Sequence, residues 1–153
     1  MSTKYIIALN TNPSICLGVT TASPGTPVVL SLLQGAGSSL TQWYIDPNSG
    51  TIRLAGSAES NPLYLDFQGI SPANNNGLII NSLVPGRAFQ HWNWVGNPPY
   101  VMNVGAPNFC IDDTASTQPG TQVVLFQLSN NINQQWHFVA VPVLEGALAA
   151  RSH

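Results

Sequence analysis

Apolar and polar residues alternate along short stretches of the chain, and residues that favour turns separate these stretches. Successive side chains of a strand point to opposite faces, so a two-residue period predicts half-buried β-strands. Asn-Pro, Pro-Gly and Asn-Gly steps between the stretches favour turns. With 13 glycines and 12 prolines, only residues 144–153 resemble a helix, and we expect them to be a frayed end or a tag remnant. Strands are predicted at residues 5–9, 15–19, 28–33, 51–54, 63–67, 78–83, 100–104, 109–112, 123–128 and 136–141.

A tryptophan with a glutamine one or two residues before it recurs three times, at intervals of 49 and 44 residues. A second landmark, an apolar residue within a short predicted strand, recurs at similar intervals. A third landmark is another apolar residue, which lies in a short strand that follows a glycine each time. Such a period is typical of a repeated supersecondary unit. The core should therefore contain three equivalent sets of large residues: Trp43, Trp92 and Trp136; Leu17, Leu65 and Ile111; Leu30, Ile80 and Leu125.

The repeats predict an all-β fold in a single domain of residues 1–153. Each repeat (about 1–48, 49–97 and 98–143, with a tail at 144–153) would hold about four strands, or roughly twelve in all. An all-β chain must close its sheet to protect the edges. Three repeats of four strands around a pseudo-threefold axis predict a β-trefoil.

The composition argues against several partners. Charged residues make up 7% of the chain and the net charge is −2, whereas an average domain has roughly 25% charged residues. This charge is too sparse to attract nucleic acid. The longest apolar run is much shorter than a membrane span, so we expect no membrane insertion.

Catalytic and metal-binding motifs are also missing from the sequence. His91, His137 and His153 lack metal-ligand spacing, and no nucleophile or phosphate-loop motif occurs. We therefore expect no metal, no cofactor and no enzyme activity. Cys16 and Cys110 occupy the same position in two repeats, which symmetry keeps apart, so they should be buried free thiols. Free cysteines and the lack of a signal peptide favour a cytoplasmic protein.

These landmarks resemble the Gln-x-Trp repeats of the ricin-B-type lectins, over residues 5–141. Gln90-His91-Trp92 and Gln134-Gln135-Trp136 match the motif, and Thr41-Gln42-Trp43 has threonine in place of the first glutamine. Cys110-Ile111-Asp112 is similar to the Cys-Leu-Asp block of the family, and Tyr64-Leu65-Asp66 matches it with tyrosine for cysteine. In length and composition the chain is similar to single-domain mushroom lectins. The resemblance implies a carbohydrate-binding protein with a role in fungal defence.

A sugar site needs a carboxylate to accept hydroxyl hydrogen bonds, an amide, and a flat side chain for the apolar face of the ring. The resemblance places these groups at Asp112, Asn133 and Phe126 of the third repeat, with Gln134 orienting Asp112 or the loop. A solvated turn is the prediction for the adjacent Asp113. The simpler alternative is that Asp112 only caps a turn and Phe126 is core.

The other two repeats match the sugar site less well. The second repeat keeps Asp66 and could form a second carbohydrate site with Asn81 and His91. The first repeat has Gly18, Ser31 and Leu40 at the three positions, so we expect no sugar there.

Together these features predict a lectin for terminal galactose, N-acetylgalactosamine or N-acetyllactosamine-type glycans. One shallow site binds weakly, so useful avidity favours a homodimer. The alternative is a β-trefoil protease inhibitor that acts through exposed loops, at residues 71–77 or 96–100, because fold alone does not define function. A structural or storage protein with vestigial sites is the third possibility.

Overall fold

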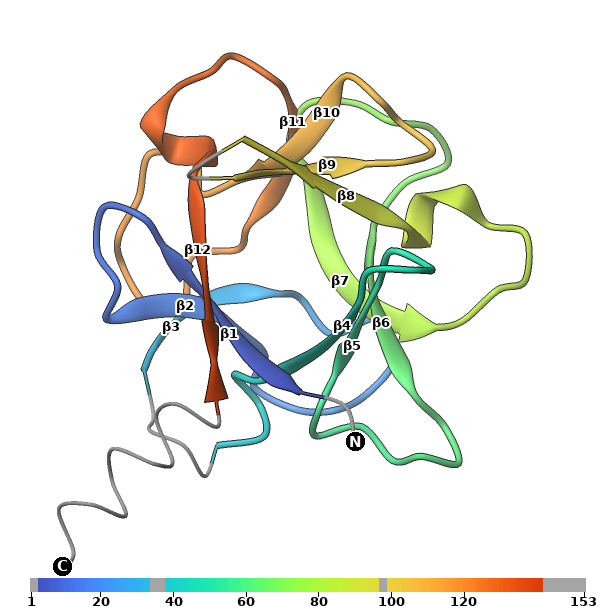
Figure 1. Ribbon diagram of the computed structural model, residues 1–153. Helices are drawn as coiled ribbons and strands as arrows, with labels where there is room; N and C mark the ends of the chain where they lie inside the picture. The colour runs from blue at the N-terminus through green and yellow to red at the C-terminus, as the bar shows by residue number, and fades with distance from the viewer. Residues whose placement is uncertain (1–2, 34–37, 97–98, 142–153) are drawn as a thin grey trace, which may run out of the picture.

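The computed structural model describes residues 3–33, 38–96 and 99–141, which form β-strands and two short 3-10 helices (Figure 1). The ten predicted strands are confirmed, and two further strands, β4 and β8, begin at Trp43 and Trp92. The predicted tail at 144–153 lies outside the described residues. The elements are β1 Lys4–Leu9, β2 Ile15–Gly18, β3 Val29–Leu32, β4 Trp43–Asp46, β5 Thr51–Leu54, β6 Leu63–Phe67, β7 Asn76–Ser82, η1 Ala88–Gln90, β8 Trp92–Val95, β9 Tyr100–Asn103, β10 Phe109–Asp112, β11 Val124–Gln127, η2 Ile132–Gln134 and β12 Trp136–Ala140.

The strands form a curled, antiparallel sheet in the order β3-β2-β1-β4-β5-β6-β7-β11-β10-β9-β8, with β12 paired to β1. The hairpins β2–β3, β6–β7 and β10–β11 project in different directions from the common interior (Figure 1). The fold is therefore all-β, as predicted. Within the described residues, no helix combines the length and apolar character needed to cross a membrane.

Three buried tryptophans make the same contact in three places. The indole Nε1 of Trp43, Trp92 and Trp136 donates to a carbonyl oxygen at 3.1 Å each time, on Leu17, Leu65 and Ile111 respectively. These three acceptor residues lie opposite Leu30, Ile80 and Leu125 in the hairpin registers. All nine predicted core residues belong to one buried cluster, which confirms the predicted core.

Backbone hydrogen bonds also link the three hairpins in a closed ring. Val28 N donates to Leu78 O at 2.9 Å, Leu78 N to Val123 O at 2.8 Å, and Val123 N to Val28 O at 3.0 Å. Each of these residues is fully buried, so the bonds satisfy polar groups that cannot reach water. The ring holds the hairpins in a fixed relation and leaves their opposite ends free to carry side chains for binding.

Candidate functional site

Asp112 is the last residue of β10, and two donors hold its carboxylate. Gln134 Nε2 donates to Oδ2 at 3.0 Å, and the backbone N of Thr114 donates to Oδ1 at 2.7 Å. Gln134 is fully buried and also donates to the carbonyl of Gln127 at 2.9 Å, while its Oε1 accepts from the N of Ser129 at 2.9 Å. One side-chain amide thus joins the end of β10 to β11 and to the segment that leads into η2.

Phe126 lies on the same face of the hairpin as Asp112. The register places Phe126 opposite Cys110 and Val124 opposite Asp112. Residues two apart on a strand share a face, so Phe126 and Asp112 are diagonal neighbours, a spacing that aromatic side chains can bridge. The Phe126 ring is half-buried rather than part of the core cluster.

Asn133 lies in η2, beside the end of β10. Its carbonyl accepts from the N of Asp113 at 3.0 Å, and its own N donates to Oδ1 of Asn131 at 2.9 Å. Its side chain is half-buried, and no hydrogen bond among the described residues uses the side-chain amide. The structure therefore brings Asp112, Phe126, Asn133 and Gln134 to one end of the β10–β11 hairpin.

The Asp112 carboxylate keeps capacity to accept further hydrogen bonds. A carboxylate offers about four acceptor positions, and the contacts from Gln134 and Thr114 use two of them. The residue is 5% exposed, so a ligand would reach it only along a narrow approach. Such an acceptor, with a fixed orientation and limited contact with water, suits hydroxyl groups of a small polar ligand.

Asp113 is buried, and the prediction that it is a solvated turn residue is wrong. It is 3% exposed, because its N bonds to Asn133 O and the turn folds back against η2. Burial raises the pKa of the Asp113 carboxyl to about 6, and the nearby charge of Asp112 adds to this effect. Hydrogen bonds from Ala115 and Ser116 act in the opposite direction.

The turn after Asp113 holds an uncommon backbone conformation. Thr114 and Ala115 have φ values of 63° and 62°, and Ser116 N donates to Asp113 O at 3.2 Å across them. Positive φ is costly for residues with a side chain, and strained backbone often occurs at binding sites. Here the strained turn directs the Thr114 N–H to the Asp112 carboxylate.

In the second repeat, protein donors already occupy the corresponding carboxylate. Asp66 is 1% exposed and accepts from Gln90 Nε2 at 3.2 Å and from the N of Phe67 at 2.8 Å. Arg87 adds Nε contacts of 3.1 and 3.3 Å and an Nη2 contact of 3.0 Å. The guanidinium also lies 5.1 Å from the centre of the Phe89 ring. These contacts leave Asp66 without an acceptor position for a sugar hydroxyl.

The other two residues predicted for the second site have partners elsewhere. Asn81 Oδ1 accepts from the N of Ser82 at 3.0 Å, and Asn81 lies opposite Tyr64, the place that Phe126 takes opposite Cys110 in the third repeat. The Nδ1 of His91 lies 2.6 Å from the carbonyl of Ser49, in the turn between β4 and β5. Asn81 therefore shares a face of its hairpin with Asp66, while His91 contacts the β4–β5 turn, and the Arg87 ion pair closes the Asp66 carboxylate to a ligand.

The first repeat has no room for a carboxylate. A Cβ added to Gly18 would lie 2.5 Å from Ser31 Oγ and 3.0 Å from Thr41 Cγ2. Thr41 is itself buried, at the position that Gln134 takes in the third repeat. Any side chain at Gly18 would therefore force these neighbours apart.

Sequence reasoning missed Arg87, the residue that makes the carboxylate site of the second repeat differ from that of the third. Arg87 stands three residues before Gln90, where Asn131 stands before Gln134. The available signal was the position of Arg87, close before the Gln90-His91-Trp92 block and in the same repeat as Asp66.

Both cysteines are free and buried, as predicted. Burial raises the pKa of the Cys16 thiol to about 11 and that of Cys110 to about 12, with the Asp112 charge adding to the latter. Within residues 3–33, 38–96 and 99–141, no three His, Cys, Asp or Glu side chains gather as metal ligands would.

No family model and no curated protein sequence matches the chain. Solved structures do match. The designed threefold-symmetric protein ThreeFoil superposes with a TM-score of 0.74 at 23% identity, over 89% of this chain and 97% of that one. The C-terminal half of an earthworm R-type lectin, solved with GalNAc, gives 0.73 at 15% identity, over 90% and 98%. The ricin B-like lectin of Macrolepiota procera, solved with lactose, gives 0.70 at 18% identity, over 88% and 93%.

The chain has the fold of the ricin B-like lectins. The same fold also occurs as part of longer proteins: a mosquitocidal holotoxin matches with a TM-score of 0.75 at 16% identity, and this chain spans 17% of its length. At these identities the likeness concerns the fold, and the binding residues have to be judged on this chain's own geometry.

Proposed function

We propose that this protein is a non-enzymatic lectin, a three-repeat β-trefoil of the Gln-x-Trp type that binds galactose or N-acetylgalactosamine termini. Structural neighbours solved with GalNAc and with lactose support carbohydrate binding. The recurring Trp-to-carbonyl bonds and the ring of hairpin hydrogen bonds support three equivalent repeats.

The observation that carries this proposal is the contrast between Asp112 and Asp66. Both carboxylates receive a glutamine amide, but Arg87 fills the remaining positions of Asp66. Asp112 keeps acceptor positions open, with Phe126 on the same face and with Asn133 next to the strand end, where its carbonyl accepts from the N of Asp113. The galactose-type site is therefore assigned to the third repeat alone.

In the proposed complex, Asp112 accepts hydrogen bonds from two adjacent sugar hydroxyls and Asn133 binds a third. Phe126 covers the apolar face of the ring. A small site of this kind gives an affinity of about 10⁻³ to 10⁻⁵ M, so a homodimer would supply the avidity that one site lacks. A cytoplasmic location, with both thiols reduced, and a defensive role complete the proposal.

A glycan array with labelled protein tests this function, and Asn133→Ala is the sharpest variant. Because no hydrogen bond among the described residues uses the Asn133 amide, its removal should abolish signals on galactosyl glycans and leave the melting temperature nearly unchanged. Asn10→Ala, at an exposed position outside the site, is the matched control and should bind as the wild type does. A wild-type array with no galactosyl or N-acetylgalactosaminyl signal would contradict the proposal.

One observation favours the protease-inhibitor alternative. The side chain of Ile70 is 99% exposed, beside Gly69 with a φ of 110°, and it begins the loop that runs to β7. Within this loop Asn76 Nδ2 donates to Ser71 O at 2.9 Å, which braces the backbone as an inhibitory loop requires. Residues 97–98 of the second predicted loop lie outside the described residues. A blank array combined with inhibition of a protease, lost in Ile70→Ala, would establish this alternative.

A further inference from the structure

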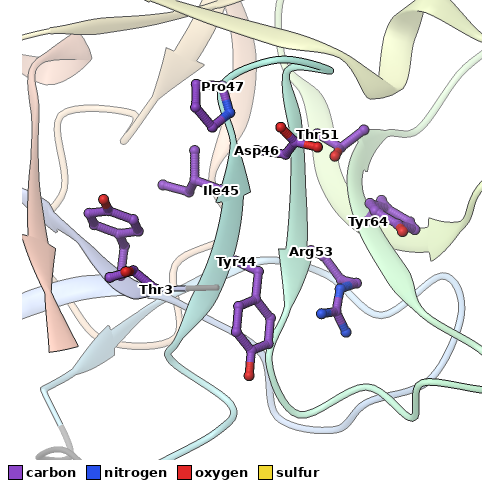
Figure 2. Close-up of a pocket in the computed structure, with 9 residues that line it drawn as sticks. Thr3, Tyr44, Ile45, Asp46, Pro47, Thr51, Arg53 and Tyr64 are labelled. Carbon is purple, nitrogen blue, oxygen red and sulfur yellow. The ribbon is translucent and has the colours of Figure 1, made fainter. Parts of the chain in front are cut away.

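A pocket of about 500 Å³ lies beside the β4–β5 hairpin, on elements that the Asp112 site does not use. Residues of β1, β4, β5 and β6 line it, together with the start of the β4–β5 turn (Figure 2). This volume suits a ligand of one or two rings. Its polar and aromatic lining comprises Tyr5, Tyr44, Asp46, Thr51, Arg53 and Tyr64.

Arg53 stands between two tyrosines in a row that crosses the strands. The register places it opposite Tyr44 on β4 and opposite Tyr64 on β6. Its guanidinium carbon lies 4.4 Å from the centre of the Tyr44 ring. Stacking on an aromatic face holds a guanidinium in place and leaves its N–H edges available.

The positive charge of this row is not neutralised within the described residues. Lys4 lies opposite Tyr44 on the other side, next to the pocket rather than among its lining residues, and adds a second positive charge nearby. The remaining basic side chain of the described ranges, Arg87, is paired with Asp66, and neither Lys4 nor Arg53 forms an ion pair there. A guanidinium with free edges suits bidentate binding of a carboxylate.

The opposite end of the pocket offers hydroxyl-binding groups. Figure 2 shows Asp46 and Thr51 at the turn end, away from the Arg53 guanidinium and the Tyr44 ring. Asp46 Oδ1 accepts from the N of Asn48 at 2.9 Å, and this bond lowers the pKa of the Asp46 carboxyl, which stays ionised. An exposed carboxylate accepts hydrogen bonds from sugar hydroxyls.

The fold does not require the tyrosine–arginine pair. The pair that follows the tryptophan is Tyr44–Arg53 across β4–β5, but it is Asn93–Met102 across β8–β9. Across β12–β1 the corresponding pair is His137–Ala8. The same backbone arrangement thus forms with unrelated side chains, so the fold alone does not explain the arginine and its tyrosines.

We infer that this pocket binds an acidic sugar residue, a hexuronic acid. The sugar carboxylate lies on Arg53 with Lys4 adding positive charge, the hydroxyls lie toward Asp46 and Thr51, and the tyrosines contact the ring. Two cations on a protein with a net charge of −2 suit a single anionic group rather than a polyanion or a charged membrane. The inference rests on the proposed function in that glycans are the ligands, and it adds a second site with a different specificity.

Titration of ¹⁵N-labelled protein with methyl glucuronide, followed by NMR, tests the inference, with methyl glucoside as the neutral match. We expect the glucuronide to shift the amide signals of Tyr44, Arg53 and Tyr64 at millimolar concentration, and the glucoside to bind at least tenfold more weakly. Arg53→Met should weaken glucuronide binding at least tenfold. Arg53→Lys keeps the positive charge and should lose less glucuronide affinity than Arg53→Met.

Two results would overturn the inference: equal binding of both glycosides, or unchanged glucuronide binding by Arg53→Met. If Arg53→Met does not fold, Arg53→Gln gives the same comparison. Asn133→Ala separates the two sites, because it should lose galactoside binding and keep glucuronide binding. If the wild type fails to bind lactose, the proposed galactoside site at Asp112 is wrong. The glucuronide titration would still show whether this pocket binds an acidic sugar.

Discussion

Replacing Arg87 with methionine measures how much the one ion pair that the described residues form contributes to the stability of the fold. The variant keeps an aliphatic stem near Phe67 and Phe89 but removes the three N–H contacts to Asp66. Asp66 is 1% exposed and would keep only Gln90 and the Phe67 N–H as donors. Removing one partner of a buried pair costs about 3–5 kcal/mol, and because the Arg87 side chain is 28% exposed, water can partly replace it. We therefore expect the free energy of unfolding of Arg87→Met to be about 3 kcal/mol lower than that of the wild type.

Urea unfolding followed by tryptophan fluorescence measures this loss, since three of the four tryptophans lie in the core. Arg53→Met is the matched control: it removes a guanidinium that stacks on Tyr44 and has no carboxylate partner, so it should cost less than about 1 kcal/mol. The double variant Asp66→Asn/Arg87→Met leaves no buried charge at this position and should be more stable than Arg87→Met alone. Equal losses in Arg87→Met and Arg53→Met, or a double variant no more stable than Arg87→Met, would refute the reasoning.

Three other predictions follow from buried polar groups. The pKa of Asp113 is about 6 in the folded protein and about 3.9 in an unfolded chain, so its contribution to stability is full below pH 4 and is lost as the pH rises through 6. Between pH 4 and 7 the free energy of unfolding should fall by roughly 2–3 kcal/mol more in the wild type than in Asp113→Asn, and parallel pH profiles would contradict this. Gln134→Ala removes three hydrogen bonds of a buried amide, including the one to Asp112, and should lower stability by about 2–4 kcal/mol and weaken galactoside binding; thermal unfolding and a lactose titration check both. Cys16 and Cys110 should not react with a thiol reagent at pH 8 until the protein is unfolded, and rapid labelling of the native protein would disprove their burial.

The strands were predictable because their signals are local. Alternating side chains and turn residues marked ten of them, and the spacing of Trp43, Trp92 and Trp136 identified the core positions. The strands β4 and β8 were missed because each buries only its first residue, the tryptophan, so the alternation of buried and exposed positions is weak.

The candidate site was predictable only in part. The residues around Asp112 were identified by their order within the repeat, and the structure brings them together because η2 returns beside the end of β10. The partnership of Asp66 with Arg87 joins positions 21 residues apart, and no local pattern shows which of them meet. The burial of Asp113 was likewise hidden, because it depends on the turn folding against Asn133.

The sequence by itself determined the all-β class, the positions of most strands and the large residues of the core, since hydrophobic periodicity and turn chemistry act between near neighbours. Only the tertiary structure decided which carboxylate remains available to a ligand. Asp66 and Asp112 occupy similar local sequences and each accepts from a glutamine amide, yet a distant arginine neutralises Asp66 alone. The same holds for the row of Lys4, Tyr44, Arg53 and Tyr64, which three strand pairings assemble. Hydrogen bonds and charge pairs act over a few ångströms in space, and the folded chain alone sets those distances.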